Sequence, residues 1–244
     1  MHFAMNKKVI FIHLLNDFSG STKVLSDILD VCDSNNIQNY LYINSGSEGF
    51  LCNKSKRQYL FYYKRFNNKF LTLISYSFSQ LILFFKMFKY LRKDCIFYVN
   101  TMMPFGPALA AMIMRKKVIY HIHETSIQKN LKSFLRLVIG MTASQIIYVS
   151  DHLSKIEPFK GIDSKTIYNS VSKSIEIKAK NYNYVHSQSP FVVTMICSLK
   201  DYKGINELLM IAKLCKKNKV ITFELILNAS NEEIKLYFDS KVVP

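Results

Sequence analysis

The sequence predicts an α/β protein whose strands form a parallel sheet, followed by a second and shorter part of the same type. Three observations support this prediction. Short, almost purely apolar runs alternate with longer segments of helical periodicity between residues 8 and 168. Residues 169–189 are instead rich in Ser, Asn, Lys and Tyr, and the alternation starts again at residue 191. Continuous apolar runs are typical of parallel strands, because parallel sheets are buried on both faces.

The first part contains the expected strands and helices of one domain. Its first strand is the apolar run that starts at Lys8, and its first helix has apolar residues at helical spacing, as in Val24, Leu25 and Ile28. The strands are expected at 8–15, 39–43, 95–99, 117–123, 145–149 and 165–168. The helices are expected at 22–31, 67–93, 104–114, 129–141 and 151–156.

The second part is short. Its strands are expected at 191–196 and 221–227, and its helices at 204–216 and 231–238. Two strand–helix units are fewer than the five or six strands that a doubly wound domain usually has. The chain is therefore divided into an N-terminal domain at 1–170, a linker at 171–189 and an incomplete C-terminal domain at 190–244.

Composition excludes several classes of protein. The chain carries 33 Lys and Arg against 17 Asp and Glu, a formal net charge of +16, and 49% of its residues are hydrophobic. It is therefore not a disordered charged tail. The five cysteines are scattered and form no C-x-x-C pair, so we expect a reducing cytoplasm without a disulfide framework or structural zinc site. The first residues run straight into a strand without a signal-peptide core, so export is not expected.

Basic residues are concentrated in one segment. Between Glu48 and Asp94 there is no acidic residue, whereas ten basic and thirteen aromatic residues occur there. The uncharged run from Phe70 to Phe85 contains several polar residues and is shorter than the about 20 apolar residues of a membrane-spanning helix. We therefore expect segment 54–93 to meet an anionic membrane surface, where each Lys or Arg contributes up to ~1 kcal/mol. The alternative is an ordinary amphipathic helix packed on the sheet with a solvated charged rim.

Open parallel sheets bind ligands at the carboxyl ends of their strands, near helix N-termini that attract phosphate. The first loop of this kind contains Ser19, Gly20 and Ser21, where the glycine allows close backbone approach and the serines offer hydroxyl groups. The patterns of nicotinamide and ATP sites, G-x-G-x-x-G and the P-loop, are absent from it. The loop is interpreted as a phosphate or acceptor loop, with a capped turn as the alternative.

The second loop follows the strand that ends in His121-Ile-His123-Glu124. Residues i and i+2 of a strand point to the same face, so both imidazoles could face one site. No further cluster supplies a third and fourth ligand, so a metal site is not expected. A histidine beside a carboxylate suits contacts to sugar hydroxyls, and the alternative is that His121 packs within the sheet while only His123 reaches the cleft.

The third loop runs from Ser198 to Gly204, where Gly204 opens a helix and both Lys200 and Lys203 precede it. Two ammonium groups near a helix N-terminus suit a diphosphate. A solvated loop is the alternative interpretation.

Taken in order along the chain, these pieces resemble the bacterial family 4 glycosyltransferases, which are retaining enzymes with the two-domain GT-B fold. The resemblance covers nearly the whole chain. The matching pieces are Phe-Ser-Gly-Ser (18–21), Tyr-His-Ile-His-Glu (120–124), Ile-Ile-Tyr-Val-Ser (146–150), Thr-Ile-Tyr-Asn-Ser-Val (166–171) and Ser-Leu-Lys-Asp-Tyr-Lys-Gly-Ile (198–205).

The resemblance implies a GT-B-like protein with a Rossmann-like N-terminal domain and an incomplete second Rossmann-like domain. It implies transfer of a sugar from a nucleotide-diphosphate donor to a hydroxyl acceptor, with retained configuration and with neither metal nor cofactor. By position, His123 would contact the transferred sugar and Lys203 would neutralise the departing diphosphate. The residues implied in substrate or donor binding are Ser19, Gly20, Ser21, His121, Glu124, Ser198, Lys200 and Gly204.

The sequence departs from the family pattern on the donor side. Ser198 stands where the family usually has an arginine. The family also has a downstream glutamate pair that holds the donor sugar and ribose. Glu224 and Glu232 have the spacing of that pair but lie too close to Gly204, so the chain is interpreted as lacking the donor half of the site.

The leading hypothesis is a cytoplasmic glycosyltransferase, peripheral on the inner membrane face, that extends a lipid-linked glycan of a surface polysaccharide such as O-antigen or capsule. The alternative is a truncated, non-catalytic module that binds membrane or partner subunits. Nucleic-acid binding is not expected, because it would rest on net charge and aromatic content without a recognition motif.

Overall fold

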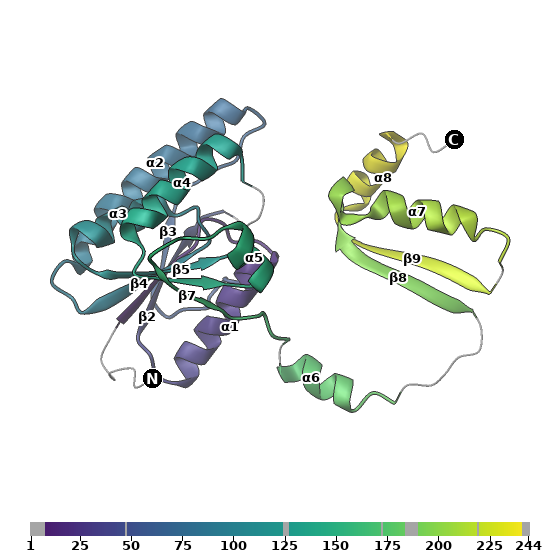
Figure 1. Cartoon of the computed structure of the whole chain (residues 1–244), viewed down its shortest axis with the longest axis horizontal. Helices are drawn as coiled ribbons and strands as arrows, with labels where there is room; N and C mark the ends of the chain where they lie inside the picture. The colour runs from purple at the N-terminus through teal and green to yellow at the C-terminus, as the bar shows by residue number, and fades with distance from the viewer. Residues whose placement is uncertain are drawn as a thin grey trace. The chain divides into compact units, whose positions relative to one another are not determined.

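The computed structural model describes residues 8–46, 48–123, 127–171, 173–183, 190–218 and 220–240. The chain divides into two units, Met1–Ile175 and Glu176–Pro244, each of which has its own sheet (Figure 1).

The centre of the first unit is a seven-stranded sheet in which every pair of neighbouring strands is parallel. The strand order is β3-β2-β1-β4-β5-β6-β7, so successive strands are added first on one side of β1 and then, from β4 onward, on its other side. The strands are β1 (Lys8–Ile12), β2 (Asn39–Asn44), β3 (Gln58–Phe61), β4 (Cys95–Asn100), β5 (Lys117–Ile122), β6 (Gln145–Tyr148) and β7 (Asp163–Thr166). The prediction of an α/β domain with a parallel sheet is therefore confirmed.

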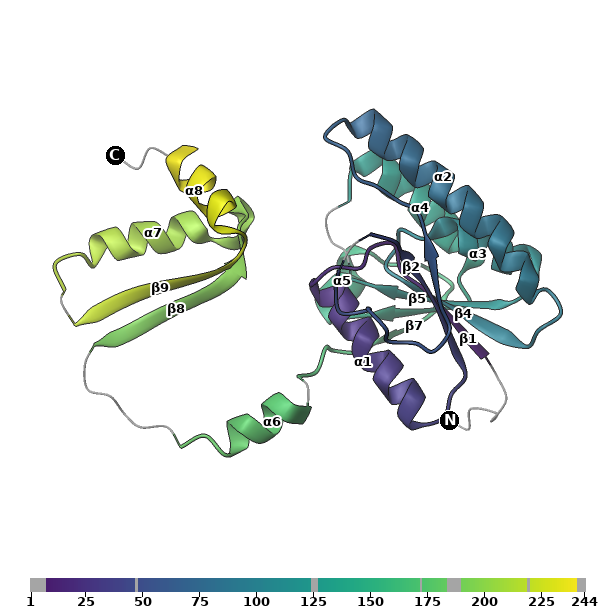
Figure 2. The ribbon, with the colours of Figure 1, turned by 180° about the vertical axis from the view of Figure 1, so that it is seen from behind.

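Helices cover both faces of this sheet (Figures 1 and 2). The helices α2, α3 and α4 lie together on one face, and α1 packs on the other. The helices of this unit are α1 (Gly20–Ser34), α2 (Lys69–Met87), the 3-10 turn η1 (Phe88–Tyr90), α3 (Phe105–Ile113), α4 (Lys129–Thr142) and α5 (Asp151–Ile156).

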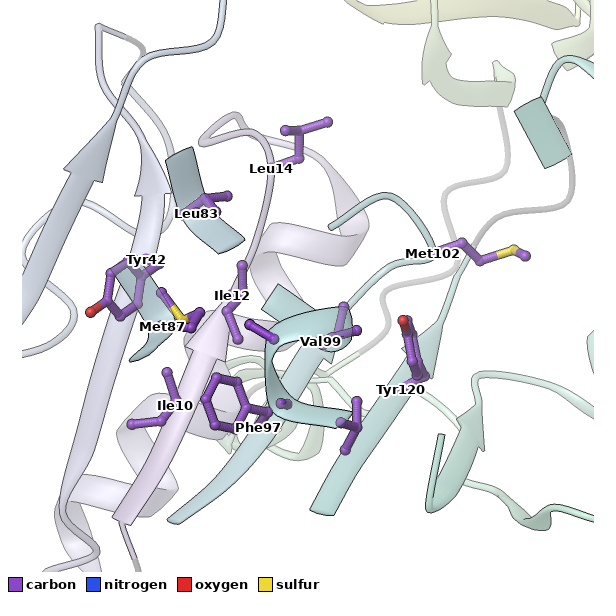
Figure 3. Packing of buried hydrophobic residues seen from close by; sticks show 14 of the residues in the cluster. Ile10, Ile12, Leu14, Tyr42, Leu83, Met87, Phe97, Val99, Met102 and Tyr120 are labelled. Carbon is purple, nitrogen blue, oxygen red and sulfur yellow. The ribbon is translucent and has the colours of Figure 1, made fainter. Parts of the chain in front are cut away.

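The alternation of side chains along β1 shows why its run is apolar throughout. Ile10 and Ile12 join the cluster under α2, α3 and α4, which Figure 3 shows, and Val9 and Phe11 join the cluster under α1. A strand covered by helices on both faces has no polar side, so its sequence lacks the period-2 pattern of a half-exposed strand.

One strand and one α-helix of the structure were not predicted from the sequence. The strand β3 is an edge strand whose Tyr59 and Leu60 remain exposed, so it lacks a buried apolar run. The helix α6 (Lys173–Lys180) lies in the segment interpreted as a linker, where an ion pair of 2.7 Å joins Glu176 and Lys180 one turn apart. The long helix expected at 67–93 ends earlier, because the chain tightens into η1 after Met87.

The second unit has a two-stranded parallel sheet. Its strands are β8 (Phe191–Ser198) and β9 (Ile221–Asn228), in register from Phe191 opposite Ile221 to Ser198 opposite Asn228. The 3-10 turn η2 (Asp201–Lys203) leads into α7 (Ile205–Leu214), and α8 (Asn231–Ser240) follows β9.

Candidate active site

Three polar side chains meet at the carboxyl ends of β1, β4 and β5. His13 follows β1, Asn100 ends β4, and His123 follows β5. The strand order changes direction between β1 and β4, and this switch point is where open α/β sheets form a ligand-binding crevice. The three side chains therefore occupy the position at which the topology itself predicts a site.

Asn100 joins the members of this cluster through its side-chain amide. The residue is fully buried. Its Oδ1 lies 3.0 Å from Nε2 of His123, and its Nδ2 donates to the carbonyl oxygen of Ser21 at 3.0 Å. The same Nδ2 lies 3.1 Å from Nδ1 of His13. One amide thus links two strands to the first turn of α1 and leaves none of its own polar atoms unsatisfied.

The hydrogen bond to Asn100 defines the tautomer of His123. Because Oδ1 of Asn100 can only accept, Nε2 of His123 carries the proton and Nδ1 carries the lone pair. Burial lowers the pKa of His13 to about 4, and burial together with the nearby imidazoles lowers the pKa of His123 to about 3. Both rings are therefore neutral at physiological pH and act as hydrogen-bonding groups rather than as cations.

His121 lies beside His123, with ring centroids 4.2 Å apart, as the alternation of side chains along β5 predicts. Its Nδ1 lies 2.8 Å from the hydroxyl of Tyr98, and burial lowers its pKa to about 4. Its Nε2 is buried and has no hydrogen-bond partner among the residues that the structure describes. His121 is only 3% exposed, whereas His123 is partly exposed, so His123 is the more accessible of the pair.

The backbone after Asn100 is strained. Thr101 has a φ of +78°, a conformation that β-branched residues rarely adopt, and it is almost completely buried. Its N–H donates to the carbonyl oxygen of His121 at 2.8 Å, which ties the end of β4 to β5. Strain of this kind is typical of functional sites, where the surrounding structure enforces it.

The loop before α1 brings its own polar groups to the same edge. Ser19 is the N-cap residue of α1, and Gly20 and Ser21 form the first turn, with Gly20 exposed and open space beside its Cα. Thr22 donates its hydroxyl to the carbonyl oxygen of Asp17 at 2.7 Å. The backbone N–H groups of this first turn form the end of a 15-residue helix, which attracts anions.

A neighbouring segment supports this loop. A Cβ on Gly49 would lie 2.4 Å from the backbone nitrogen of Asp17, so only glycine allows the two segments to approach this closely. Asn16 accepts a hydrogen bond from the backbone of Leu51 at 3.0 Å through its Oδ1. These contacts fix the path of the chain between β1 and α1.

The remaining predicted residues lie in the second unit. Ser198 ends β8, and Lys200 and Lys203 are exposed on the turn that leads to α7. Gly204 is the N-cap residue of α7 and has a φ of +86°, which favours glycine. The turn is anchored from α8, because Tyr237 donates its hydroxyl to Asp201 at 2.6 Å. Two cations thus precede a helix N-terminus, an arrangement that suits a diphosphate.

Sequence reasoning missed His13 and Asn100. The signal available for each was a polar residue at the end of an apolar strand, but the order of the strands was needed to show that these two ends are neighbours. Glu124 lies outside the described residues. Within the described ranges, no group of three or more His, Cys, Asp or Glu side chains is placed to bind a metal ion.

Comparison with known proteins shows similarity of structure. No protein-family profile matches the sequence, and no curated protein is significantly similar to it. HepE of Anabaena, solved in complex with UDP and glucose, has a TM-score of 0.61 and 19% identity over 96% of this chain and 64% of its own. The lipopolysaccharide outer core galactosyltransferase WaaB, solved in its apo form, has a TM-score of 0.59 and 14% identity, again over 96% and 64%. The UDP-GlcNAc 2-epimerase of Neisseria meningitidis, bound to UDP-GlcNAc, has a TM-score of 0.55 and 14% identity over 96% of this chain and 69% of its own.

These similarities concern the fold, since one fold serves a transferase and an epimerase among the three proteins. The chain spans 64% of the length of HepE and of WaaB. The similarity extends over 96% of the chain, and the strand order of the first unit is that of a doubly wound sheet. The predicted fold class is confirmed: the chain has a GT-B-like α/β fold with a Rossmann-like N-terminal sheet.

Proposed function

We propose that the protein is a glycosyltransferase that moves a sugar from a nucleotide-diphosphate donor to a hydroxyl group of a lipid-linked glycan, with retention of configuration. The observation that supports this most directly is His123, whose orientation and tautomer are fixed by the buried Asn100 at the switch point of a GT-B-like sheet. The neighbouring structures that hold UDP, with glucose in one of them, support a nucleotide sugar as donor.

Each group has a role in this proposal. His123 contacts the transferred sugar, and the N–H groups at Gly20 and Ser21 bind phosphate or acceptor oxygens. Lys203 and Lys200, at the N-terminus of α7, stabilise the charge that develops on the leaving diphosphate. These groups require neither a metal ion nor a cofactor in the transfer step. The proposed location is the cytoplasmic face of the inner membrane, where a lipid-linked acceptor is exposed.

The test is donor turnover by the purified chain, with UDP-glucose, UDP-galactose, UDP-GlcNAc and GDP-mannose offered together with a bacterial lipid extract. His123→Ala should lower kcat at least about 100-fold, because a fixed hydrogen bond to the reacting sugar is lost.

Asn100→Ala should act through His123 and lower kcat without removing a group that touches the sugar. Lys203→Met should lower kcat more than it raises KM, because charge develops on the leaving group only in the transition state.

Matched controls are present in the chain. His152→Ala changes an exposed histidine on α5, and Lys216→Met changes an exposed lysine beyond α7, so neither should alter turnover. Unchanged turnover in His123→Ala would remove His123 from the site. Nucleotide-sugar binding without any product would favour the non-catalytic module instead. An epimerised free donor would point to the reaction of the 2-epimerase neighbours, and NMR of the product reports both this and the anomeric configuration.

A further inference from the structure

One face of the first unit has an unusual charge distribution. The helices α2, α3 and α4 lie side by side on this face, which we call the three-helix face (Figures 1 and 2). None of the three helices contains an Asp or Glu residue. The single helix α1 on the opposite face carries Asp27, Asp30 and Asp33 against one Lys. Next to these helices, the buried Glu157 pairs with Lys132 and Arg136 of α4, so these two cations of the face are already neutralised.

The three-helix face is also strongly apolar. Along α2 a stripe of large apolar side chains points away from the core, at the i, i+3, i+4 and i+7 spacing of one helix face. Its members are Phe70, Leu71, Ile74, Phe78, Leu81 and Phe85, which are 47–68% exposed. Ile113 of α3 and Leu137 of α4 are also exposed large apolar side chains of this face, at 57% and 62%. Exposed apolar areas that span several elements usually mark an interaction site.

The opposite side of α2 is part of the domain core, which determines how the helix can meet a membrane. Tyr76 donates its hydroxyl to the carbonyl oxygen of Met103, and Gln80 accepts from the backbone N–H of Gly106 at 3.1 Å. By length and composition, the segment Lys69–Tyr90 could cross a membrane. A helix that crossed the membrane would lose these hydrogen bonds and expose their polar groups to lipid. The helix α2 is therefore suited to lie along the membrane surface, with one face in the domain core and the other in the lipid.

Charge indicates which partner fits this face. Lys69 and Lys86 on α2 and Lys129 on α4 are exposed, and no acidic side chain of the three helices offsets them. Two copies of this face brought together would place like charges against like charges. Anionic lipid head groups have the complementary charge, and the acyl region accepts the apolar stripe.

We propose that the three-helix face docks on an anionic membrane with α2 parallel to the surface, its stripe Phe70–Phe85 inserted and Lys69, Lys86 and Lys129 on the head groups. This limits the expected contribution of segment 54–93 to α2, since Lys54 pairs instead with Asp30 of α1 at 2.8 Å, and it adds α3 and α4, which lie outside that segment. The inference adds to the proposed function the membrane that carries the acceptor, but it does not depend on catalysis. A vesicle-binding test can therefore fail without affecting the result of the turnover test, and the reverse also holds.

The experiment measures flotation of the full chain with vesicles of phosphatidylcholine alone and of phosphatidylcholine with about one-third phosphatidylglycerol. The apolar variant is Phe78→Ser, Leu81→Ser and Phe85→Ser, and the charge variant is Lys69→Glu, Lys86→Glu and Lys129→Glu. The apolar control places Ser at Val31, Ile196 and Leu214, which are exposed on other elements. The charge control places Glu at Lys165, Lys216 and Lys217, which changes the net charge equally.

We expect the chain to bind the anionic vesicles at least about tenfold more strongly than the neutral ones, and each face variant to weaken that binding at least about tenfold. Both controls should bind as the unchanged chain does, and circular dichroism should show that all variants are folded. Flotation that is unaffected by both face variants, or lowered equally by the controls, would overturn the proposal. A dimer in solution that the apolar variant converts to monomers, without vesicle binding, would assign the face to a second copy instead.

Discussion

At the scale of single residues, the neutral charge of three neighbouring imidazoles defines the candidate site. His13, His121 and His123 all have pKa values lowered by burial, to about 4, 4 and 3. A proton on any one of them would be poorly solvated and would be repelled by a proton on another. Asn100 gains its role from this neutrality, because a neutral His123 can keep its Nε2 N–H directed at the amide oxygen.

This neutrality makes stability depend on pH. The folded pKa values lie below the ordinary value of 6.5, so the unfolded chain binds more protons than the folded chain between roughly pH 6.5 and pH 4. The free energy of unfolding should be flat above that range and should decrease as the pH falls through it. For His121 alone the loss by pH 4 is about 3 kcal/mol. Urea unfolding followed by circular dichroism from pH 7.5 to about pH 4 measures this loss.

The variant His123→Gln removes one titrating ring, so it should reduce the slope of stability against pH by about one third. His152→Gln, at an exposed ring, serves as the control and should leave the slope unchanged. A slope that stays the same in His123→Gln would contradict the assignment of a neutral, partly buried His123.

At the scale of elements, a single glycine sets the spacing between α2 and α3. A Cβ on Gly106 would lie 2.1 Å from the carbonyl oxygen and 2.8 Å from the carbonyl carbon of Gln80, both of them backbone atoms. Because backbone cannot rotate away as a side chain can, any larger residue must push the two helices apart. The candidate docking stripe on α2 is therefore held in place by a contact on the opposite side of that helix.

Gly106→Ala should destabilise the chain by about 3 kcal/mol, because the helix pair must separate to admit the methyl group. The matched control is Gly140→Ala in α4, where a Cβ would meet nothing within 4 Å. Alanine is the better helix former in such open surroundings, so this control should stabilise the chain by about 0.5–1 kcal/mol. Urea unfolding of both variants measures the change in the free energy of unfolding. We expect this change to have opposite signs in the two variants. Equal effects would show that Gly106 is not a packing constraint.

At the scale of the whole molecule, the two units differ in how much core each one has. The first unit has apolar clusters on both faces of its sheet. Among the described residues of the second unit, Ile205 is the only buried hydrophobic side chain, and its sheet has two strands. A two-stranded sheet with little buried apolar area is marginal by itself. Stability therefore resides in the first unit.

A chain of residues 1–175 should consequently fold alone. Its thermal midpoint should lie within about 3 °C of the midpoint of the full chain, because both apolar clusters of the first unit lie within these residues. Residues 190–244 alone should lack a cooperative transition. Circular dichroism during heating measures both, and a cooperative transition in the short piece or none in 1–175 would refute the argument.

Much of the first unit was predictable because its signals are local. The strands β1, β4, β5 and β6 are apolar runs, and α1 and α4 have helical periodicity within their own sequences. β3 and α6 could not be found in this way. The edge position of β3 does not require a buried run, and the sequence of α6 is too polar to show one apolar face.

The candidate site was only half visible in the sequence. The pair His121 and His123 follows from the period of a strand, and Gly204 from its place before a helix. His13 and Asn100 lie 87 residues apart, and neither has a local pattern that would relate them.

The sequence by itself therefore determined the α/β class, most elements, and the separate loops that carry polar groups, because these depend on periods within a few residues. Only the tertiary structure decided that β1, β4 and β5 are neighbours, so that His13, Asn100 and His123 form one network. It also gathered α2, α3 and α4, none of which contains an acidic residue, on one face of the sheet. The physical reason is that strand order and helix layering arise from burial between segments distant in the chain, which leaves no periodic trace in any one of them.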